Sequence, residues 1–215
     1  MVYWGAMSAE PATTAPSPGP VAPDRRTRGR ERRRNQVYEA AVALFVDKGF
    51  DATTMEDIAE RADVARATVF NHFARKTAFL DEWSARRRHR ALDAIYAEHL
   101  EDHSVAEILE RYMVELARVS TKNRRETVAL MGAAIHTTNV LGNPALAHEL
   151  ARILATAQSD GQLARDLNPE SAGRLIATAY FATLTAWIDT DPAPFDLTAE
   201  LVSVIHLVLQ GLLPR

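Results

Sequence analysis

The chain has 215 residues, of which 47% are hydrophobic and 25% are charged, and it contains no cysteine. This length and composition are ordinary for a globular protein with one large or two small cores. The lack of cysteine excludes disulfide frameworks, thiolate metal sites and cysteine nucleophiles. No apolar run reaches the roughly 18 residues of a membrane span, and the N-terminus lacks the apolar segment of a signal peptide. We therefore expect a cytoplasmic protein with no membrane contact.

The net charge of −3 is distributed unevenly along the chain. Residues 24–90 hold 16 Lys and Arg against 11 Asp and Glu, a net charge of +5, whereas residues 91–215 hold 9 against 16, a net charge of −7. A basic N-terminal part is typical of proteins that bind nucleic acid, although solvated helix faces also carry charge runs.

Residues 1–23 are dense in Pro, Ala, Ser and Thr, and we expect them to form a disordered tail. Both Met1 and Met7 are possible translation starts. Seven arginines then lie between Arg25 and Arg34. Two interpretations of this run stay open: a solvated linker that becomes the first turn of a helix, or a basic arm that contacts DNA phosphates or enters a minor groove.

Apolar periodicity and capping residues predict four helices in the basic part of the chain. Gly49 is expected to end the first helix, and a capping box of Thr53 and Glu56 is expected to start the second. A tight turn at residues 62–64 separates the second helix from the third. The predicted helices cover about residues 31–48, 53–61, 66–73 and 77–99.

The predicted third helix has two faces of different chemistry. Its apolar side, with Val69, Phe70 and Phe73, is expected to pack on the first two helices. Two helices joined by a short turn, the second with a polar face, are typical of a helix-turn-helix whose second helix lies in the DNA major groove. The polar face here is small and carries no net charge: Ala67, Thr68, Asn71 and His72.

Individual side chains of this segment suit different parts of a DNA duplex. Asn71 both donates and accepts hydrogen bonds, which suits adenine, and the short side chain of Ala67 lets the helix approach the bases. Helix N-termini and basic side chains suit phosphates. Further contacts to bases or phosphates are therefore expected from Thr54, Arg66, Thr68, His72 and Lys76.

The stretch "AAVALFVDKGFDATTMEDIAERADVARATVFNHFARKTAFL" resembles the N-terminal DNA-binding domain of the tetracycline-repressor (TetR) family of transcriptional regulators. The matched pattern is LF…KGF…TT…DIA…V…T.F..HF..K, which is more specific than a lone helix-turn-helix. The resemblance implies an all-α homodimer that usually represses transcription until a small molecule binds its C-terminal domain. It also implies the DNA-contacting residues Thr54, Arg66, Ala67, Thr68, Phe70, Asn71, His72 and Lys76.

Three positions depart from the family pattern. The turn reads Asp63-Val64-Ala65 where Gly-Val-Ser is usual, and Phe70 stands where tyrosine is common. Asp63 tolerates a left-handed conformation. Ala65 lacks the side-chain N-cap of the third helix, which contributes about 0.5–2 kcal/mol, and Phe70 lacks a hydroxyl for a phosphate.

The rest of the chain is predicted to be helical, so we expect an all-α protein. A DNA-binding domain with a basic arm would cover residues 24–76, and a helical ligand-binding and dimerisation domain would cover residues 77–215. Ser104 and Glu107 form a capping box, while Asn143-Pro144 and Asn168-Pro169 each place an N-cap before proline. The helices expected here begin at Ser104 and cover 124–137, 143–160, 168–188 and 198–213.

The last two predicted helices are apolar around most of their circumference, which is more than one buried stripe requires. We expect them to form a homodimer interface, as the resemblance also implies. A symmetric dimer would place two recognition helices about 34–36 Å apart on a palindromic double-stranded DNA operator.

A pocket for a small, largely apolar effector is expected among the helices between Trp83 and Trp187. Aromatic and Met residues at helical spacing also fit a plain core. The candidate lining residues are Tyr112, Met113, Met131, His136, Thr137, Tyr180, Thr183 and Trp187.

His99 and His103 are four residues apart, with Glu101 and Asp102 between them, but a helix that starts at Ser104 leaves His103 outside it. We therefore expect no metal site. No phosphate loop or nucleophile–base pair is present, so no catalytic residue, cofactor or enzymatic activity is expected. Three functions stay open: a ligand-released dimeric repressor; a DNA-binding regulator without a small-molecule effector, controlled by a protein partner or acting as an activator; and an all-α enzyme that carries a DNA-binding module.

Overall fold

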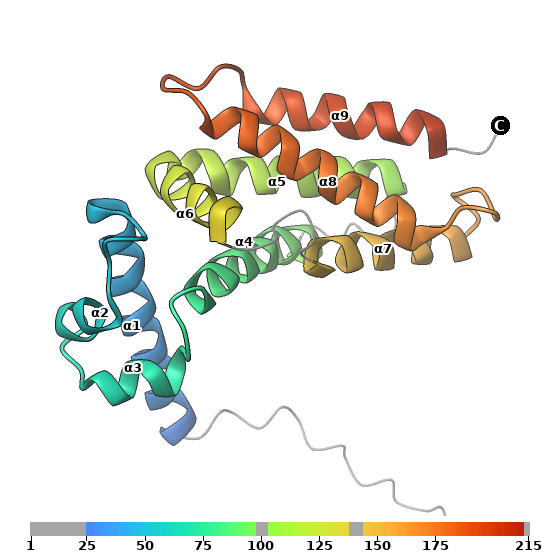
Figure 1. Cartoon of the computed structure of the whole chain (residues 1–215). Coiled ribbons are helices and arrows are strands. Elements are labelled where there is room, and N and C mark those ends of the chain that lie inside the picture. The colour runs from blue at the N-terminus through green and yellow to red at the C-terminus, as the bar shows by residue number, and fades with distance from the viewer. Residues whose placement is uncertain (1–24, 98–102, 138–143, 213–215) are drawn as a thin grey trace, which may run out of the picture.

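The computed structural model describes residues 25–97, 103–137 and 144–212, and these residues form nine α-helices and no strand (Figure 1). The predicted all-α fold is thus confirmed for this part of the chain. None of these helices has the length and apolar character needed to cross a membrane. The helices are α1 (Arg25–Lys48), α2 (Met55–Arg61), α3 (Arg66–His72), α4 (Ala78–Ala97), α5 (Val105–Lys122), α6 (Arg124–Thr137), α7 (Pro144–Ser159), α8 (Pro169–Ile188) and α9 (Leu197–Leu212).

The helices are arranged in a small three-helix head and a larger bundle, with α4 running from one into the other (Figure 1). In the head, α2 packs against both α1 and α3. In the bundle, α4 lies on α5 and α6, α7 packs along α8, and α9 lies on α5 and α8. A contact of α1 with α6 is the second connection between the two parts. The head therefore rests on the bundle at two places, one of them covalent.

An aromatic cluster fills the core of the head. The ring of Phe45 on α1 lies 4.9 Å from that of Phe50 and 6.0 Å from that of Phe79, measured between centroids. Phe73, directly after α3, stacks on Phe79 at 4.0 Å. Because Phe79 belongs to the first turn of α4, the start of α4 is built into the core of the head.

The cap of α2 differs from the predicted one. The N-cap is Thr54, and its capping-box partner is Asp57, so the predicted box of Thr53 and Glu56 was wrong by one residue. Thr53 is buried, and its hydroxyl donates to the carbonyl of Gly49 at 2.8 Å. That hydroxyl closes the loop before α2, which leaves the next threonine to cap the helix.

Other predicted boundaries are confirmed. Gly49 and Gly161 end α1 and α7 with positive φ of 88° and 77°, the conformation that favours glycine after a helix. Asp63 has a φ of 49°, so it takes the left-handed turn position expected of it. Ala65 precedes α3 without a side-chain cap, and the Asn168 side chain caps α8 before a proline. The predicted Ser104 and Glu107 capping box opens α5, while the Asn143 cap lies outside the described residues.

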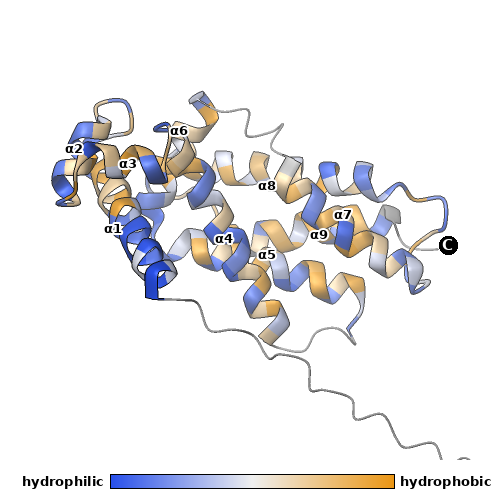
Figure 2. Ribbon diagram, turned by 90° about the horizontal axis from the view of Figure 1, so that it is seen from below, coloured by the Kyte–Doolittle hydropathy of each residue, from blue (hydrophilic) through white to orange (hydrophobic). Residues whose placement is uncertain are grey.

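The first helix starts earlier than the sequence indicated. Periodicity predicted a start near Glu31, whereas α1 begins at Arg25 and takes in the arginine run. These turns are exposed and strongly hydrophilic (Figure 2). Residues 25–33 are all exposed and carry no apolar stripe, so the periodicity gave no signal. Arginine is nevertheless a good helix former, and the run continues the helix outward beside α3.

Candidate nucleic-acid interface

α3 exposes the face that the sequence predicts to meet DNA. Val69 and Phe73 are buried, whereas Arg66, Ala67 and Asn71 are exposed. The buried stripe is narrow because α3 has only seven residues, of which Val69 alone is buried.

Phe70 is 39% exposed, so the expectation that it packs in the core was wrong. The guanidinium of Arg66 lies 5.3 Å from the centroid of its ring. Arg66 also pairs with Glu56 at 2.7 Å, which joins the start of α3 to α2. The exposed Phe70 is therefore on the same surface as the other residues that the resemblance assigns to DNA.

A basic groove runs between the N-terminal part of α1 and the helix α3. It encloses about 470 Å³. One wall comes from α1 and the other from three of the residues predicted to contact DNA. The lining residues are Gly29, Arg30, Arg33, Thr68, Asn71 and His72. Sequence reasoning noted the arginines but missed this wall, because it follows only from the helical continuation of α1.

Arg34 attaches the end of α3 to α1 and α4. Its Nη1 donates to the carbonyl oxygen of His72 at 2.7 Å, and its guanidinium lies 4.3 Å from the centroid of the Phe73 ring. Its Nη2 forms an ion pair with Glu82 on α4 at 2.7 Å. Burial opposes ionisation of Glu82, but the hydrogen bonds from Arg34 and Arg86 outweigh it and lower the pKa of this carboxyl below its ordinary value. The position of α3 is thus set by a charge on α4.

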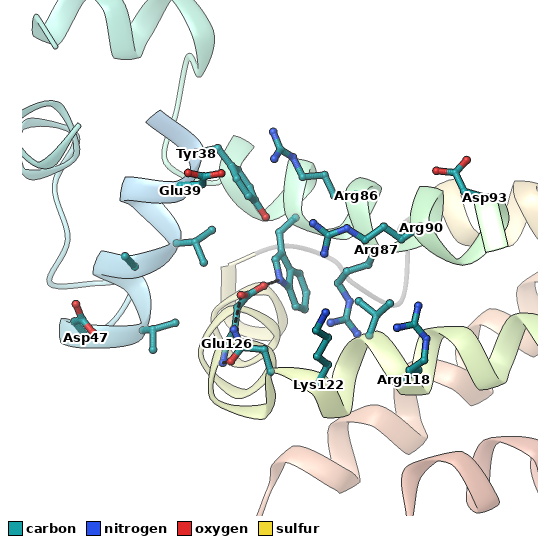
Figure 3. A pocket seen from close by; sticks show the side chains of 16 residues that line it. Tyr38, Glu39, Asp47, Arg86, Arg87, Arg90, Asp93, Arg118, Lys122 and Glu126 are labelled. Carbon is teal, nitrogen blue, oxygen red and sulfur yellow. Dashed lines mark hydrogen bonds between the residues drawn. The ribbon is translucent and has the colours of Figure 1, made fainter. Parts of the chain in front are cut away.

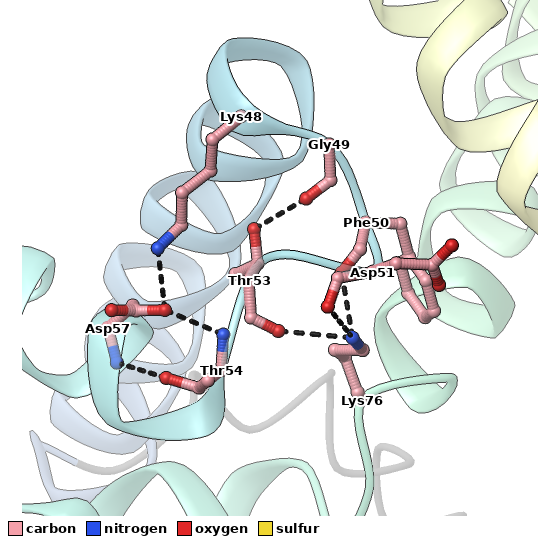
Figure 4. A network of polar contacts seen from close by, with 8 residues as sticks. All are labelled: Lys48, Gly49, Phe50, Asp51, Thr53, Thr54, Asp57 and Lys76. Atoms are coloured by element: carbon pink, nitrogen blue, oxygen red, sulfur yellow. Dashed lines mark hydrogen bonds and ion pairs between the residues drawn. The ribbon is translucent and has the colours of Figure 1, made fainter.

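Lys76 occupies the loop between α3 and α4 and binds the loop before α2 (Figure 4). Its ammonium donates to the carbonyl oxygens of Phe50, Asp51 and Thr53 at 2.7, 3.3 and 3.0 Å. It also lies 4.4 Å from the centroid of the Phe50 ring. These three bonds use all three protons of the ammonium, so Lys76 holds the two loops together. Its predicted phosphate contact stays a prediction.

The start of α2 is fixed by a second polar network in the same view (Figure 4). The Thr54 hydroxyl accepts from the Asp57 N–H at 3.1 Å, and the Asp57 carboxylate accepts from the Thr54 N–H at 2.7 Å. Lys48 pairs with Asp57 at 2.6 Å. The hydrogen bond from Lys48, followed by those from Thr54, lowers the pKa of Asp57 to about 2. Thr54 is exposed at the N-terminus of α2, beside α3.

The predicted effector residues fall in several environments of the bundle. A cavity of about 20 Å³ lies there, which is about the space of one water molecule. Met131 and Tyr180 line it, together with Trp83, Arg87 and Arg88 among others. The remaining candidates are the buried Tyr112, Met113 and Trp187, the half-buried Thr183, and the exposed His136 and Thr137.

The Tyr112 hydroxyl donates to Glu149 at 3.0 Å, and Glu149 also pairs with Arg88 at 3.4 Å. Burial, followed by the nearby carboxylate of Glu149, raises the pKa of Tyr112. His103 precedes α5 and is exposed, while His99 lies outside the described residues. Within those residues no three His, Asp or Glu side chains gather into a potential metal site.

The outer faces of α8 and α9 carry solvent-exposed apolar side chains. Leu175 is 54% and Leu207 is 72% exposed. Ala182 and Ala186 are also exposed on α8. His206, on α9, lies 2.8 Å from the Glu110 carboxylate of α5, so it is engaged within the chain.

The family model described as "Bacterial regulatory proteins, tetR family" matches residues 37–83, which cover the helix-turn-helix and the start of α4. Residues 37–83 thus form a DNA-binding domain of the TetR family. The chain is a DNA-binding transcriptional regulator, and regulators of the TetR family bind DNA operators and small-molecule effectors, typically as dimers.

Similarity to TetR-family proteins extends beyond the helix-turn-helix. The transcriptional repressor KstR of Rhodococcus jostii is 24% identical over 86% of this chain and 87% of its own. The crystal structure of Thermus thermophilus FadR, a TetR-family repressor in complex with lauroyl-CoA, has a TM-score of 0.64 and 28% identity over 85% of this chain and 96% of that one. SmeT, the repressor of a Stenotrophomonas maltophilia efflux pump, shares the fold with a TM-score of 0.66 and 21% identity over 85% of this chain and 91% of its own.

The environment of His72 yields a prediction about pH. Burial and the positive charges of Arg30, Arg34 and Arg33 lower the pKa of His72 below its ordinary 6.5. The folded protein therefore favours the neutral ring. The contribution of His72 to the free energy of unfolding is fully present above its ordinary pKa and is lost as the pH falls through the lowered pKa of the folded state. We expect an NMR titration of the free protein to place the His72 pKa below 6.5, and the variant Arg33→Gln to raise it.

Operator binding should raise the same pKa, because phosphates neutralise the arginines. A His72 that titrates at or above its ordinary value in free protein, with no response to Arg33→Gln, would contradict this description of the groove.

Proposed function

We propose that the head binds a double-stranded operator through the exposed face of α3 and the basic groove beside it. The observation that supports this most directly is the groove itself, where α1 arginines face Thr68, Asn71 and His72. Asn71 and Thr68 would read base edges, and Ala67 would let α3 approach them. The other predicted contacts, Thr54, Arg66, Phe70, His72 and Lys76, would lie along the backbone with Arg30 and Arg33.

We propose that the protein acts as a homodimer formed by α8 and α9. The exposed leucines on both helices support this, because apolar patches of this kind usually meet a partner. Two heads related by a twofold axis would then read a palindromic operator with half-sites about one DNA turn apart. Binding of chromosomal DNA supports the predicted cytoplasmic location.

We propose that the regulator is a repressor released by a small, largely apolar effector in the bundle. KstR, FadR and SmeT are named as repressors, which supports repression, and FadR was crystallised with lauroyl-CoA, whose lauroyl chain supports an apolar part of the effector site. A cavity of about 20 Å³ admits no such molecule, so binding requires side chains around Met131 and Tyr180 to move. An effector lowers operator affinity only if it favours a conformation in which the head binds DNA poorly.

The second candidate is a regulator without a small-molecule effector, and the small cavity of the bundle supports it. The resemblance to regulators along most of the chain supports a protein without catalytic activity. Release of the operator by an apolar compound separates the first candidate from the second.

Operator binding is tested by fluorescence anisotropy with DNA from upstream of the protein's own gene, against a scrambled duplex at physiological salt. We expect a preference of about 10³-fold or more, as is usual for specific sites. The same assay then screens apolar compounds for release. Equal weak affinity for both duplexes, and for other genomic fragments, would contradict the proposal.

Two variants separate base reading from phosphate binding. Asn71→Ala should reduce the binding free energy for the operator by about 1–3 kcal/mol, because a base contact is lost. It should change the binding of scrambled DNA little. Arg33→Gln should weaken binding to both duplexes, and it should lower the salt dependence of the DNA affinity by about one released counterion. An Asn71→Ala variant that keeps the full preference would remove this residue from the base-reading set.

The dimer is tested by placing a charge on the proposed interface. Leu207→Glu should convert the protein to monomers in sedimentation velocity, because the carboxylate would be buried between subunits, and it should weaken operator binding. Leu207 is 72% exposed, so the subunit itself should fold normally. Ala155→Glu, on an exposed position of α7, is the control and should stay dimeric. A dimer that survives Leu207→Glu unchanged would place the interface elsewhere.

A further inference from the structure

A large cleft lies between the head and the bundle, bounded by residues of both parts. It encloses about 880 Å³ and is bounded by α1, α4, α5 and α6 (Figure 3). This volume is within the range of small-molecule sites. The α1 residues that line it lie between Tyr38 and Asp47, toward the end of α1 that is remote from the arginine run. The cleft is thus separate from the DNA-binding groove.

The walls formed by α4 and α5 are rich in cations. Arg86, Arg87 and Arg90 come from α4, and Arg118 and Lys122 come from α5. Figure 3 shows Arg87, Arg90, Arg118 and Lys122 directed into the space between these two helices. The acidic lining residues have other positions: Glu39 and Asp47 lie across the cleft on α1, Asp93 lies at its far end, and Glu126 lies at its floor on α6.

Three of these cations have no counter-charge in the described part of the chain. Neither Arg87, Arg90 nor Lys122 has a carboxylate of those residues within 4.0 Å, whereas Arg86 pairs with Glu82 and Arg118 with Glu115. The Glu126 carboxylate is occupied by the indole N–H of Trp83 and the side-chain amide of Asn123, both at 2.8 Å. Arg87, Arg90 and Lys122 therefore stay without a direct ion pair to any described carboxylate, and the five cations of the lining exceed its four carboxylates by one charge.

Arg87 is the strongest sign of a missing anion, because it is only 5% exposed. Its guanidinium donates to the hydroxyls of Ser120 and Thr127, which are neutral, and lies 4.4 Å from the centroid of the Trp83 ring. A buried cation is costly without a paired charge. An anion in the cleft would supply that charge.

The number of cations and the opposite wall indicate the class of anion. One carboxylate would neutralise one of the three, whereas a phosphate group carries a charge of about −1.5 to −2 and three acceptor oxygens. The α1 wall adds half-buried apolar side chains, Val42 and Val46, across from the cations. A phosphate with an organic part of moderate size fits both walls.

The rim of the cleft is connected to the recognition helix. Arg86 donates to Glu82 on its own helix at 2.8 Å and to Asn35 of α1 at 2.7 Å. Glu82 pairs in turn with Arg34, which donates to the carbonyl oxygen of His72 at the end of α3. An anion that draws Arg86 into the cleft would loosen this series of contacts.

We propose that this cleft is an effector site for a small organic phosphate, bound by Arg87, Arg90 and Lys122. Occupation of the site lowers operator affinity by drawing Arg86 away from Glu82 and Asn35. The site is additional to the apolar pocket of the bundle. Only the operator step rests on the function proposed above, because binding itself is measured without DNA.

Binding is tested by calorimetry on the full chain with inorganic pyrophosphate at constant ionic strength. The double variant Arg90→Gln/Lys122→Gln should raise the Kd at least tenfold, and both side chains are exposed, so folding should be unchanged. The control Arg152→Gln/Arg165→Gln removes two exposed arginines elsewhere and should bind as the wild type does. No binding by the wild type, or equal binding by the cleft variant, would overturn the proposal. Loss of binding in Arg30→Gln/Arg33→Gln alone would place the anion in the DNA groove and overturn it as well.

Coupling is tested by operator anisotropy with and without pyrophosphate. Wild-type affinity should fall, whereas Arg86→Lys, which keeps the charge but not the two simultaneous hydrogen bonds, should bind pyrophosphate and hold the operator equally with and without it. Pyrophosphate binding in the cleft with no change in wild-type operator affinity would overturn the link to α3. A protein that binds pyrophosphate but no operator would instead contradict the proposed function.

Discussion

The stacked rings of Phe73 and Phe79 are the contact on which the arrangement of the molecule depends. They place the first turn of α4 inside the core of the head, so that the end of α3 is packed on a helix that continues into the bundle. Burial of two aromatic rings at such a joint contributes several kcal/mol, and offset-stacked and edge-to-face pairs are the favoured arrangements. A change in the position of α4 must therefore move the recognition helix with it.

Arginines connect the same parts by charge. Arg34 donates from Nη1 to the carbonyl oxygen of His72 at the end of α3, and its Nη2 pairs with Glu82 on α4. Among the described residues, arginines without an ion pair line both the groove beside α3 and the cleft between head and bundle. The groove is suited to the phosphates of DNA and the cleft to a small anion. Positive charge therefore lies in the free protein where negatively charged ligands are expected to bind.

The sequence predicted the helices well because their caps are local. Ser104 and Asn168 act within three residues of themselves, and Gly49 and Gly161 end helices through their own backbone, whereas the cap of α2 was predicted one residue too early because Thr53 and Thr54 are adjacent. The start of α1 was missed because residues 25–33 are exposed and form no apolar stripe, and the exposure of Phe70 was missed because Val69 alone is buried within the short α3. The cleft and the role of Lys76 depend on residues that are far apart in the chain. Local sequence patterns do not predict which helices pack together, so neither feature could be predicted.

The attachment of the head to α4 is measured most directly as a distance between the two heads of a dimer. The chain has no cysteine, so Ala74→Cys gives one spin label per subunit at an exposed position beside α3. The account predicts a single narrow distance distribution by pulsed electron spin resonance in free protein, and a broad one in Ala74→Cys/Phe79→Leu, where the stacked ring is lost but the position stays apolar. A distribution that is equally broad with and without Phe79 would contradict a head held in place by α4.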